Sequence, residues 1–342
     1  MTTEPHEPAD DPALADISVG ERVVVRYRLP EGSTPPLTDV IGEVVSTNPL
    51  TVLAADGHPV LIPAASVVAL KSLSPRTIRT SEIRALETAA AFGWPGSEYA
   101  WIDGWLLRAG HGYTRRANSA VPIGDSNGPA RVTAETLHRI GAWYAALGLP
   151  LQLTLPDRLA TVPPGWNSWG ETRVLGIDLE NSVLPQGPSM VRIAPEPDIS
   201  WLEIHRYRGD EPSGHTATVP LPEVLSAVHD GQLGFASLGL PSPIAIARGA
   251  LTTASDGRRW VGLTCVAVVA AHRRHGLGAL VCGELLRWGR DRGATHAYVQ
   301  VEAGNVEAMK LFSELGFLDH HSYRYAVPGG SAPTARTDGR PE

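Results

Sequence analysis

The sequence predicts an α/β domain preceded by a small all-β domain, and three observations support this prediction. The chain has 342 residues, which exceeds the length of one ordinary domain. Residues 17–73 carry short runs of β-branched residues separated by turns. Over the rest of the chain, strand-like and helix-like patterns alternate, which is typical of a mixed sheet with flanking helices.

Composition narrows the function classes. The chain carries 29 basic and 36 acidic residues, so a net charge of −7 provides no general attraction to nucleic acid or to an anionic membrane. The first 16 residues are acidic and proline-rich, unlike a signal peptide, and the longest uncharged apolar stretch, 261–271, is much shorter than the roughly 20 residues that span a bilayer. We therefore expect a cytoplasmic protein whose partners include neither nucleic acid nor membrane.

The two cysteines, Cys265 and Cys282, lie in one apolar-rich region without the spacing of a metal site. We expect two buried thiols rather than a disulfide, and no bound metal.

Residues 17–73 are expected to form a small barrel of the SH3-like kind. The strand-like runs are ERVVVRYRL, DVIGEVVST, LTVLAAD and HPVLIPAASVVAL, and Asp56-Gly57 is the strongest hairpin turn among them. Such a barrel is typical of a structural or docking module. Residues 1–16 and 329–342 lack apolar periodicity and are predicted to be disordered tails.

The segment 81–190 shows the order helix, strand pair, helix, strands. Ser81 is the expected N-cap of the first helix. The predicted helices are 81–92 and 133–147, and the predicted strands are 101–109, 117–123, 151–155 and 172–179. Residues 181–200 are polar and proline-rich, which indicates a boundary or a long connection.

The segment 191–328 alternates more regularly. Its predicted helices are 221–231, 278–292 and 306–315, and its predicted strands are 244–254, 260–269, 296–301 and 321–327.

The motif that carries chemistry follows the strand that ends at Val269. Arg273-Arg-His-Gly276-Leu-Gly278 forms a basic, glycine-bearing turn from which a helix begins at once. Glycines let backbone amides approach a ligand, and the helix start adds unpaired N–H groups and a positive dipole end. Two arginines suit phosphate oxygens. Neither the P-loop pattern nor the dinucleotide fingerprint is present, because no Lys-Ser/Thr follows and the glycine spacing differs.

This Arg-x-x-Gly-x-Gly turn resembles the pyrophosphate loop of the GNAT acetyltransferase superfamily. The segment from Asn305 to Phe317 resembles the same family's Asn-x-x-Ala-x-x-Leu-Tyr-x-x-x-Gly-Phe pattern. The resemblance implies a GNAT fold and acetyl-coenzyme A as the cofactor. It implies that the following residues contact that cofactor: Val266, Ala267, Val268, Arg273, Arg274, His275, Gly276, Leu277, Gly278, Ala279, Asn305, Ala308 and Phe312.

One position departs from the family pattern. Phe312 stands where members commonly carry a tyrosine that protonates the departing thiolate. Tyr323 and Tyr325 on the last strand are the substitutes we expect, since a phenol pKa near 10 is close to that of a thiol. Alternatively, the thiolate leaves without a protein acid. Glu302, at a strand end, is the candidate base for the amine.

The overall layout also resembles an actinobacterial family with an N-terminal SH3-like domain, whose members are described as N-acetylglutamate synthase-like or histone acetyltransferase-like. The stretches that carry this likeness are 104–124, 300–302 and 320–325. It suggests a barrel (17–73), a degenerate GNAT-like half (81–190) and an acetyl-CoA-binding catalytic half (191–328).

The function expected from these patterns is an N-acetyltransferase that moves an acetyl group directly to a primary amine. The leading acceptor is L-glutamate, whose carboxylates Arg108, Arg116 and Asn118 would bind. The alternatives are a protein or peptide lysine acetyltransferase and a non-catalytic acetyl-CoA sensor. Partners are therefore a small-molecule amine or a peptide, and homodimerisation stays open.

Overall fold

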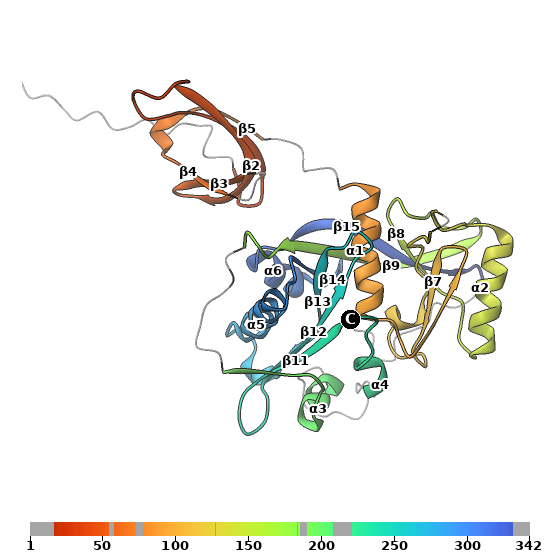
Figure 1. Cartoon of the computed structure of the whole chain (residues 1–342). Helices are drawn as coiled ribbons and strands as arrows, with labels where there is room; N and C mark the ends of the chain where they lie inside the picture. Colours follow the sequence, from red (N-terminus) through yellow and green to blue (C-terminus); the bar gives the residue numbers. More distant parts are fainter. Residues whose placement is uncertain are drawn as a thin grey trace, which may run out of the picture. The chain divides into compact units, whose positions relative to one another are not determined.

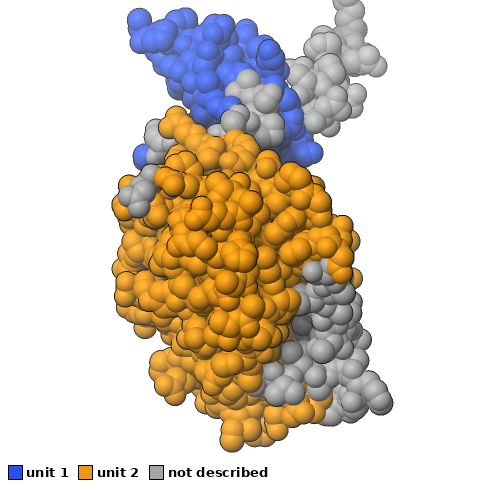
Figure 2. All heavy atoms as spheres, turned by 90° about the vertical axis from the view of Figure 1, so that its right-hand side faces the viewer, with its two compact units in different colours: residues 1–77 blue, residues 78–342 orange. Residues whose placement is uncertain are grey.

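The computed structural model describes residues 17–54, 58–72, 78–126, 128–182, 184, 190–207 and 221–330. The chain divides into two compact units, 1–77 and 78–342 (Figure 2). The predicted tail 1–16, all but the first two residues of the predicted tail 329–342, and the predicted Asp56-Gly57 turn lie outside the described residues.

The first unit is all-β, as predicted. Its strands are β1 (Arg22–Arg28), β2 (Leu37–Thr47), β3 (Leu50–Ala54), β4 (Pro59–Ile62) and β5 (Val67–Ser72). They form one antiparallel sheet in the order β4-β3-β2-β1-β5. Successive strand residues point to opposite faces, so Val23, Val25, Val40 and Val44 share a buried core.

The second unit alternates helices and strands. Its helices are α1 (Thr80–Gly93), α2 (Ala134–Ala146), α3 (Ile199–Tyr207), α4 (Pro222–Leu225), α5 (Leu277–Asp291) and α6 (Val306–Glu314). Its strands are β6 (Glu98–Ile102), β7 (Trp105–Ala109), β8 (Leu153–Pro156), β9 (Trp166–Asp178), β10 (Val191–Ala194), β11 (Gln232–Leu238), β12 (Ala245–Thr253), β13 (Arg259–Val268), β14 (His296–Glu302) and β15 (Leu318–Pro328).

Eight of these strands form one mixed sheet in the order β10-β11-β12-β13-β14-β9-β15-β8. Strands β13 and β14 pair in parallel, and the other neighbouring strands of this sheet pair antiparallel. Strands β8 and β9 come from the segment 81–190, yet they flank β15 from the other end of the chain. The division of this unit into two halves stays a prediction.

Helices cover both faces of the sheet (Figure 1). On one face, α5 and α6 pack on Leu175 and Val299. On the other, α1 packs on the neighbouring strand residues Val174 and Tyr298. Because alternate strand residues face opposite ways, neighbouring residues of β9 and β14 are buried on opposite faces of the sheet.

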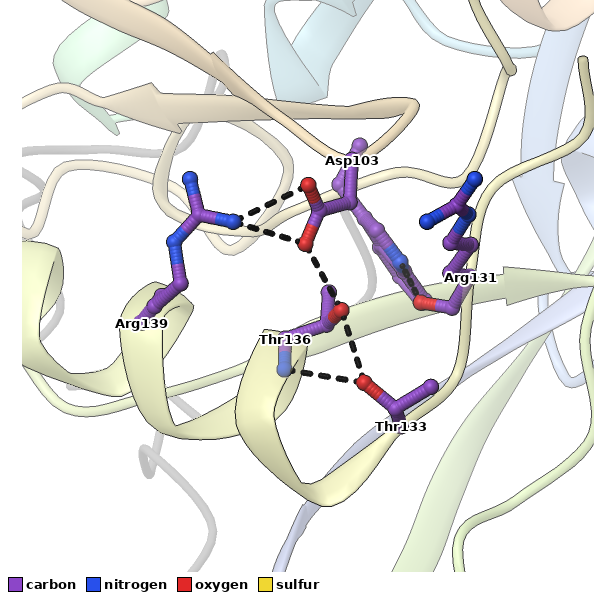
Figure 3. Close-up of polar contacts among 6 residues, drawn as sticks. Asp103, Arg131, Thr133, Thr136 and Arg139 are labelled. Atoms are coloured by element: carbon purple, nitrogen blue, oxygen red, sulfur yellow. Dashed lines mark hydrogen bonds and ion pairs between the residues drawn. The ribbon is translucent and has the colours of Figure 1, made fainter. Parts of the chain in front are cut away.

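The β6–β7 hairpin forms a separate two-stranded sheet that is tied to the start of α2 (Figure 3). The Asp103 carboxylate, at the hairpin turn, accepts hydrogen bonds from Thr136 Oγ1 at 2.8 Å and from Arg139 Nη1 at 2.8 and 2.9 Å. The hydrogen bond from Thr136, followed by Arg139, holds the pKa of Asp103 below its usual value. Thr133 caps α2 by accepting from the Thr136 amide at 3.1 Å.

Several local predictions are wrong. Ser81 lies inside α1, and the Glu82 carboxylate accepts from the Arg79 amide at the helix start, at 2.8 Å. The predicted strand 117–123 is instead a 3-10 turn, Arg116–Asn118, followed by isolated bridges. Helix α4 is much shorter than the predicted 221–231, and β11 occupies the sequence just after it. The connection predicted over 181–200 contains β10 and the start of α3, whose apolar patterns are short.

Candidate functional site

The site begins where the parallel strands β13 and β14 part. Their register runs from Trp260 opposite His296 to Leu263 opposite Val299, and both strands continue beyond it. On the other side of β13, two residues, Cys265 and Val266, stand opposite the single residue Ala247 of β12. Such a β-bulge bends the strand that carries the extra residue. The bend leaves the backbone of β13 beyond Leu263 without pairing in the register to β14.

A cavity of about 210 Å³ occupies this opening. Its first wall comes from β13, β14 and α6. It includes Val266 and Ala267 of β13, and Asn305, Ala308 and Phe312 at and within α6. These five residues are among the predicted cofactor contacts, and the structure brings them together.

Asn305 is the N-cap of α6. Its Oδ1 accepts a hydrogen bond from the Ala308 amide at 3.1 Å, so the side-chain Nδ2 points away from the Ala308 amide. Phe312 is 5% exposed and packs edge-on against Phe317 with ring centroids 5.4 Å apart. Asn305 and α6 therefore contribute one polar side chain, the Ala308 methyl group and the Phe312 ring to the wall.

The basic turn lies between β13 and α5. Gly276 is the N-cap of α5 with φ +75°, and Arg274 is also left-handed with φ +65°. The Arg273 Nε donates to the Val268 carbonyl at 3.0 Å, and His275 Nδ1 lies 3.3 Å from the His272 carbonyl. This side of the turn is exposed, and the first-turn amides of α5, from Leu277 to Ala279, have no carbonyl partner within the helix. The turn thus presents amides and guanidinium groups to an anion.

A second wall faces the first and comes from three separate segments. Trp94 follows α1, Tyr113, Thr114 and Arg116 follow β7, and His205 lies in the last turn of α3. Of these residues, only Arg116 is among the predicted site residues. The Trp94 indole donates to Thr114 Oγ1 at 3.1 Å. The Tyr113 hydroxyl is hydrogen-bonded to His205 Nε2.

Asn118 shapes this second wall without lining the cavity. Its Oδ1 accepts from the Gly110 and Gly112 amides, both at 2.9 Å, and its Nδ2 donates to the carbonyls of Tyr113 at 2.9 Å and Thr114 at 2.7 Å. The turn that it closes includes Thr114 at φ +59°, a conformation that is strained for a β-branched residue. Strain of this kind concentrates at functional sites.

Arg108 lies outside the residues that line the cavity. Its guanidinium is 3% exposed and donates to the Ser119 carbonyl at 3.3 Å, to Ser119 Oγ at 3.1 Å and to the Trp94 carbonyl at 3.4 Å. Burial lowers the pKa of Arg108. The substrate roles assigned to Arg108 and Asn118 stay predictions, and both residues here hold the backbone around the second wall.

The predicted catalytic residues lie near the cavity but not among the residues that line it. Tyr323 and Tyr325 are each 1% exposed, and their hydroxyl groups are 3.5 Å apart. The Arg116 Nε lies 3.5 Å from the Tyr323 hydroxyl. Glu302, at the end of β14, forms an ion pair with Arg115. Their catalytic roles stay predictions.

One observation tests whether the residues fit a coenzyme A arm. Thr264 lines the cavity, and its Oγ1 is buried without a hydrogen-bond partner among the described residues. A buried unpaired hydroxyl is costly, so a ligand that supplies a polar partner would be stabilised there. Together with the backbone of β13 beyond Leu263, which lies outside the register to β14, and the amides of α5, this hydroxyl fits an elongated ligand that ends in phosphates. Within the described residues, no group of three His, Cys, Asp or Glu side chains is placed to hold a metal ion.

Sequence reasoning missed Trp94, Tyr113, Thr114 and His205. The signal that could have found part of this set is the glycine-rich run 110–114, because closely spaced glycines and polar residues between two apolar segments indicate a constrained turn. Nothing in the sequence places His205 beside Tyr113, since the two residues meet only through packing of α3.

Family comparisons cover both units. Residues 80–326 match the family model described as "Probable histone acetyltransferase Rv0428c C-terminal", and residues 17–71 match "Rv0428c N-terminal Sm-like domain". The chain is 40% identical over 310 residues to the "Probable histone acetyltransferase Rv0428c" of Mycobacterium tuberculosis, covering 90% of this chain and 94% of that protein. The all-β prediction for the first unit is confirmed, and the matched description is Sm-like.

The chain is also similar to more distant proteins. The "Uncharacterized N-acetyltransferase YobR" of Bacillus subtilis is 27% identical over 265 residues, covering 71% of this chain and 98% of that protein. A solved structure, "GCN5-related N-acetyltransferase from Kribbella flavida", is 18% identical with a TM-score of 0.49, covering 75% of this chain and 97% of that chain. No helix among the described residues combines the length and apolarity that a membrane span requires.

Proposed function

The chain belongs to the family of the probable histone acetyltransferase Rv0428c, and on that premise we propose that it transfers the acetyl group of acetyl-CoA directly to a primary amine. The protein is an acyltransferase with a GNAT-like mixed sheet and an all-β N-terminal domain. The observation that carries the proposal is the opening between β13 and β14, which is lined by five of the predicted cofactor residues. The other predicted contacts, Val268 and residues 273–279, are not among the residues that line the cavity; they follow it in the chain, at the end of β13 and in the basic turn before α5.

Each part of the first wall has a task in this reaction. The Val266–Val268 backbone, which pairs with β12 but not in the register to β14, and the Thr264 hydroxyl would hold the pantetheine arm. The amides at the start of α5, with Arg273 and Arg274, would hold the pyrophosphate. Acetyl-CoA supplies the activated acetyl group as a thioester. Binding along β13 would place that thioester at the bulge, between the two walls, where an amine can be held against it.

Two acceptor classes follow from different observations. The 40% identical relative is named a histone acetyltransferase, which favours lysine side chains of a protein or peptide. Arg116 reaches the second wall and carries a guanidinium, which favours an amino acid with a carboxylate, such as L-glutamate. We propose a primary amine as the acceptor and leave these two classes to the experiment.

The test is steady-state consumption of acetyl-CoA by the full chain against L-glutamate, other amino acids, polyamines and lysine-containing basic peptides. Turnover with at least one amine, with a stoichiometric acetylated product by mass spectrometry, is the expected result. Glutamate-specific turnover selects the amino-acid acceptor, and peptide-specific turnover selects the lysine side chain of a protein or peptide. Tight acetyl-CoA binding without turnover of any amine would overturn the enzyme proposal in favour of an acetyl-CoA sensor.

A further inference from the structure

Phe312 leaves the cavity without the tyrosine that commonly serves this family as an acid. Phe312 lines the first wall and has no proton to give. Resting on the function proposed above, we infer that Tyr113 and His205 form the proton-transfer pair of this enzyme, with the Tyr113 hydroxyl as the acid for the departing sulfur. The pair belongs to the second wall, opposite Phe312.

Tyr113 is placed for this role by its position and its bond. The residue is 8% exposed and lines the cavity, together with Cys265 and Val266 at the β13 bulge where the thioester would lie. Its hydroxyl is hydrogen-bonded to His205 Nε2. The turn that carries Tyr113 is held by the four hydrogen bonds of Asn118. A phenol fixed in this way keeps one orientation, which general acid catalysis requires.

His205 is held by its own neighbours. It lies one turn after Trp201 on α3, and the two rings pack with centroids 5.4 Å apart and an interplanar angle of 30°. Trp201 is 2% exposed and its indole donates to the Ala236 carbonyl at 3.0 Å, so the ring that supports His205 is fixed to the sheet. An imidazole that is hydrogen-bonded to a phenol is a side chain suited to relay a proton.

Tyr323 and Tyr325 are less well placed for the same task. Both are buried, and neither is among the residues that line the cavity. The Arg116 guanidinium, which does line the cavity, lies 3.5 Å from the Tyr323 hydroxyl through its Nε. A proton from Tyr323 would therefore have to pass a guanidinium, which keeps its protons, before it reached the thioester.

The step balances with these two groups. The amine nitrogen forms a bond to the acetyl carbonyl carbon, and the C–S bond breaks with its electron pair on sulfur. The Tyr113 hydroxyl gives its proton to that sulfur. The Tyr113 oxygen recovers a proton from His205 Nε2, and the imidazole takes up the proton that the amine nitrogen loses. The products are an amide and a free thiol, and the pair returns to its starting state.

The test compares Tyr113→Phe with Tyr323→Phe, two substitutions that each remove one hydroxyl. We expect Tyr113→Phe to lower kcat by about 100-fold or more, the usual range for a general acid. It should leave the Kd for acetyl-CoA, measured by isothermal titration calorimetry, within about threefold. A larger loss of kcat in Tyr323→Phe than in Tyr113→Phe would overturn the pair. The control is Tyr99→Phe, at a tyrosine that is 51% exposed and not among the residues that line the cavity, and it should retain kcat within about threefold.

His205→Gln and the double variant distinguish a relay from a structural role. Because the two groups act as a unit, the double variant Tyr113→Phe/His205→Gln should be no slower than Tyr113→Phe alone. Additive losses, or a lowered Tm with a weakened Kd, would indicate a structural role and overturn the pair. If the wild type turns over an amine and Tyr113→Phe has the same kcat, the Tyr113–His205 pair is overturned and the proposed function stands. If the wild type turns over no amine, the proposed function is overturned as well.

Discussion

The two walls of the cavity are built in different ways. The first wall comes from β13, β14 and α6, which follow one another between Thr264 and Phe312 along the chain. The second wall joins residues from three segments, at 94, 113–116 and 205. The first wall is therefore specified by local sequence patterns, and the second depends on tertiary packing that brings distant segments together.

Buried polar side chains hold the second wall in place. Arg248 of β12 is fully buried and donates to the carbonyls of Leu225 at 2.7 Å, Gly93 at 3.0 Å and Ala227 at 2.9 Å, while its guanidinium stacks 4.5 Å from the Trp94 ring centroid. Burial lowers the pKa of Arg248 to about 10, so it stays charged at neutral pH. One guanidinium thus ties the end of α1 and the segment after α4 to the central sheet.

The largest expected effect is on acetyl-CoA binding, through the basic turn that follows β13. Gly278→Glu places a carboxylate in the first turn of α5, where like-charge repulsion would oppose a pyrophosphate. We expect the Kd for acetyl-CoA to rise by about 100-fold or more, as measured by calorimetry.

Gly278→Ala is the matched control. A Cβ at position 278 would meet Leu311 Cδ2 at 3.5 Å and Val268 Cγ2 at 3.9 Å, which are ordinary contacts. We expect this variant to bind acetyl-CoA like the wild type. Retained binding in Gly278→Glu would contradict the assignment of the turn to phosphate.

The second expected effect concerns the other wall. Asn118→Ala removes four hydrogen bonds and leaves the Gly110 and Gly112 amides without their acceptor. We expect a loss of about 3 kcal/mol in the free energy of unfolding, since each unsatisfied buried group costs about 1–3 kcal/mol. The KM for the amine should rise while the Kd for acetyl-CoA changes little.

Chemical denaturation and steady-state kinetics check this prediction. Asn181→Ala is the control, because the Asn181 side chain is exposed and donates only one described hydrogen bond, to Asp178 at 2.9 Å; it should change stability by less than about 0.5 kcal/mol. An equal weakening of acetyl-CoA binding in Asn118→Ala would show that the walls are not independent.

The third effect concerns the ion pair that joins the walls. Glu302 ends β14 beside the first wall, and Arg115 belongs to the turn that carries the second. Arg115 also lies over the Trp169 ring, 5.0 Å from its centroid. A double-mutant cycle with Glu302→Gln and Arg115→Met should give a coupling of about 1–3 kcal/mol in unfolding experiments.

The same variants separate pairing from catalysis. If Glu302 is the base for the amine, Glu302→Gln lowers kcat far more than Arg115→Met does, at equal loss of stability. Equal kcat losses in the two variants would reduce Glu302 to a structural partner of Arg115.

The smallest effect uses the two thiols as reporters. Cys265 lines the cavity at φ +56°, whereas Cys282 is buried in α5 and burial raises its pKa to about 12. N-ethylmaleimide should label Cys265 and leave Cys282 unmodified, because the thiolate is the reactive form. Saturating acetyl-CoA should slow the labelling of Cys265 by about tenfold, followed by intact-protein mass spectrometry. Unslowed labelling would place the ligand away from the β13 bulge.

The patterns predicted most of the elements that build the first wall. The patterns predict a helix over 278–292, where α5 spans Leu277–Asp291, and a helix over 306–315, where α6 spans Val306–Glu314. Both helices have a sharp start, a glycine turn or an asparagine cap, followed by a regular apolar stripe. Prediction failed where the apolar pattern was short, as in β10 and α3, which lie in or next to a polar, proline-rich region. It also failed where two structures give the same pattern: residues 117–123 are apolar because they are buried, not because they form a strand.

By itself, the sequence determined the fold class, the acetyltransferase family and the local elements of the proposed cofactor side, because a turn, a helix start and a cap are encoded by neighbouring residues. Only the tertiary structure brought together the second wall, which is the proposed acceptor side. Packing of α1, the β7 turn and α3 brings Tyr113 beside His205, and packing also places the Tyr323 hydroxyl 3.5 Å from Arg116 Nε. Contacts between residues that lie 92 positions apart in the chain depend on the whole core, and no local pattern records them.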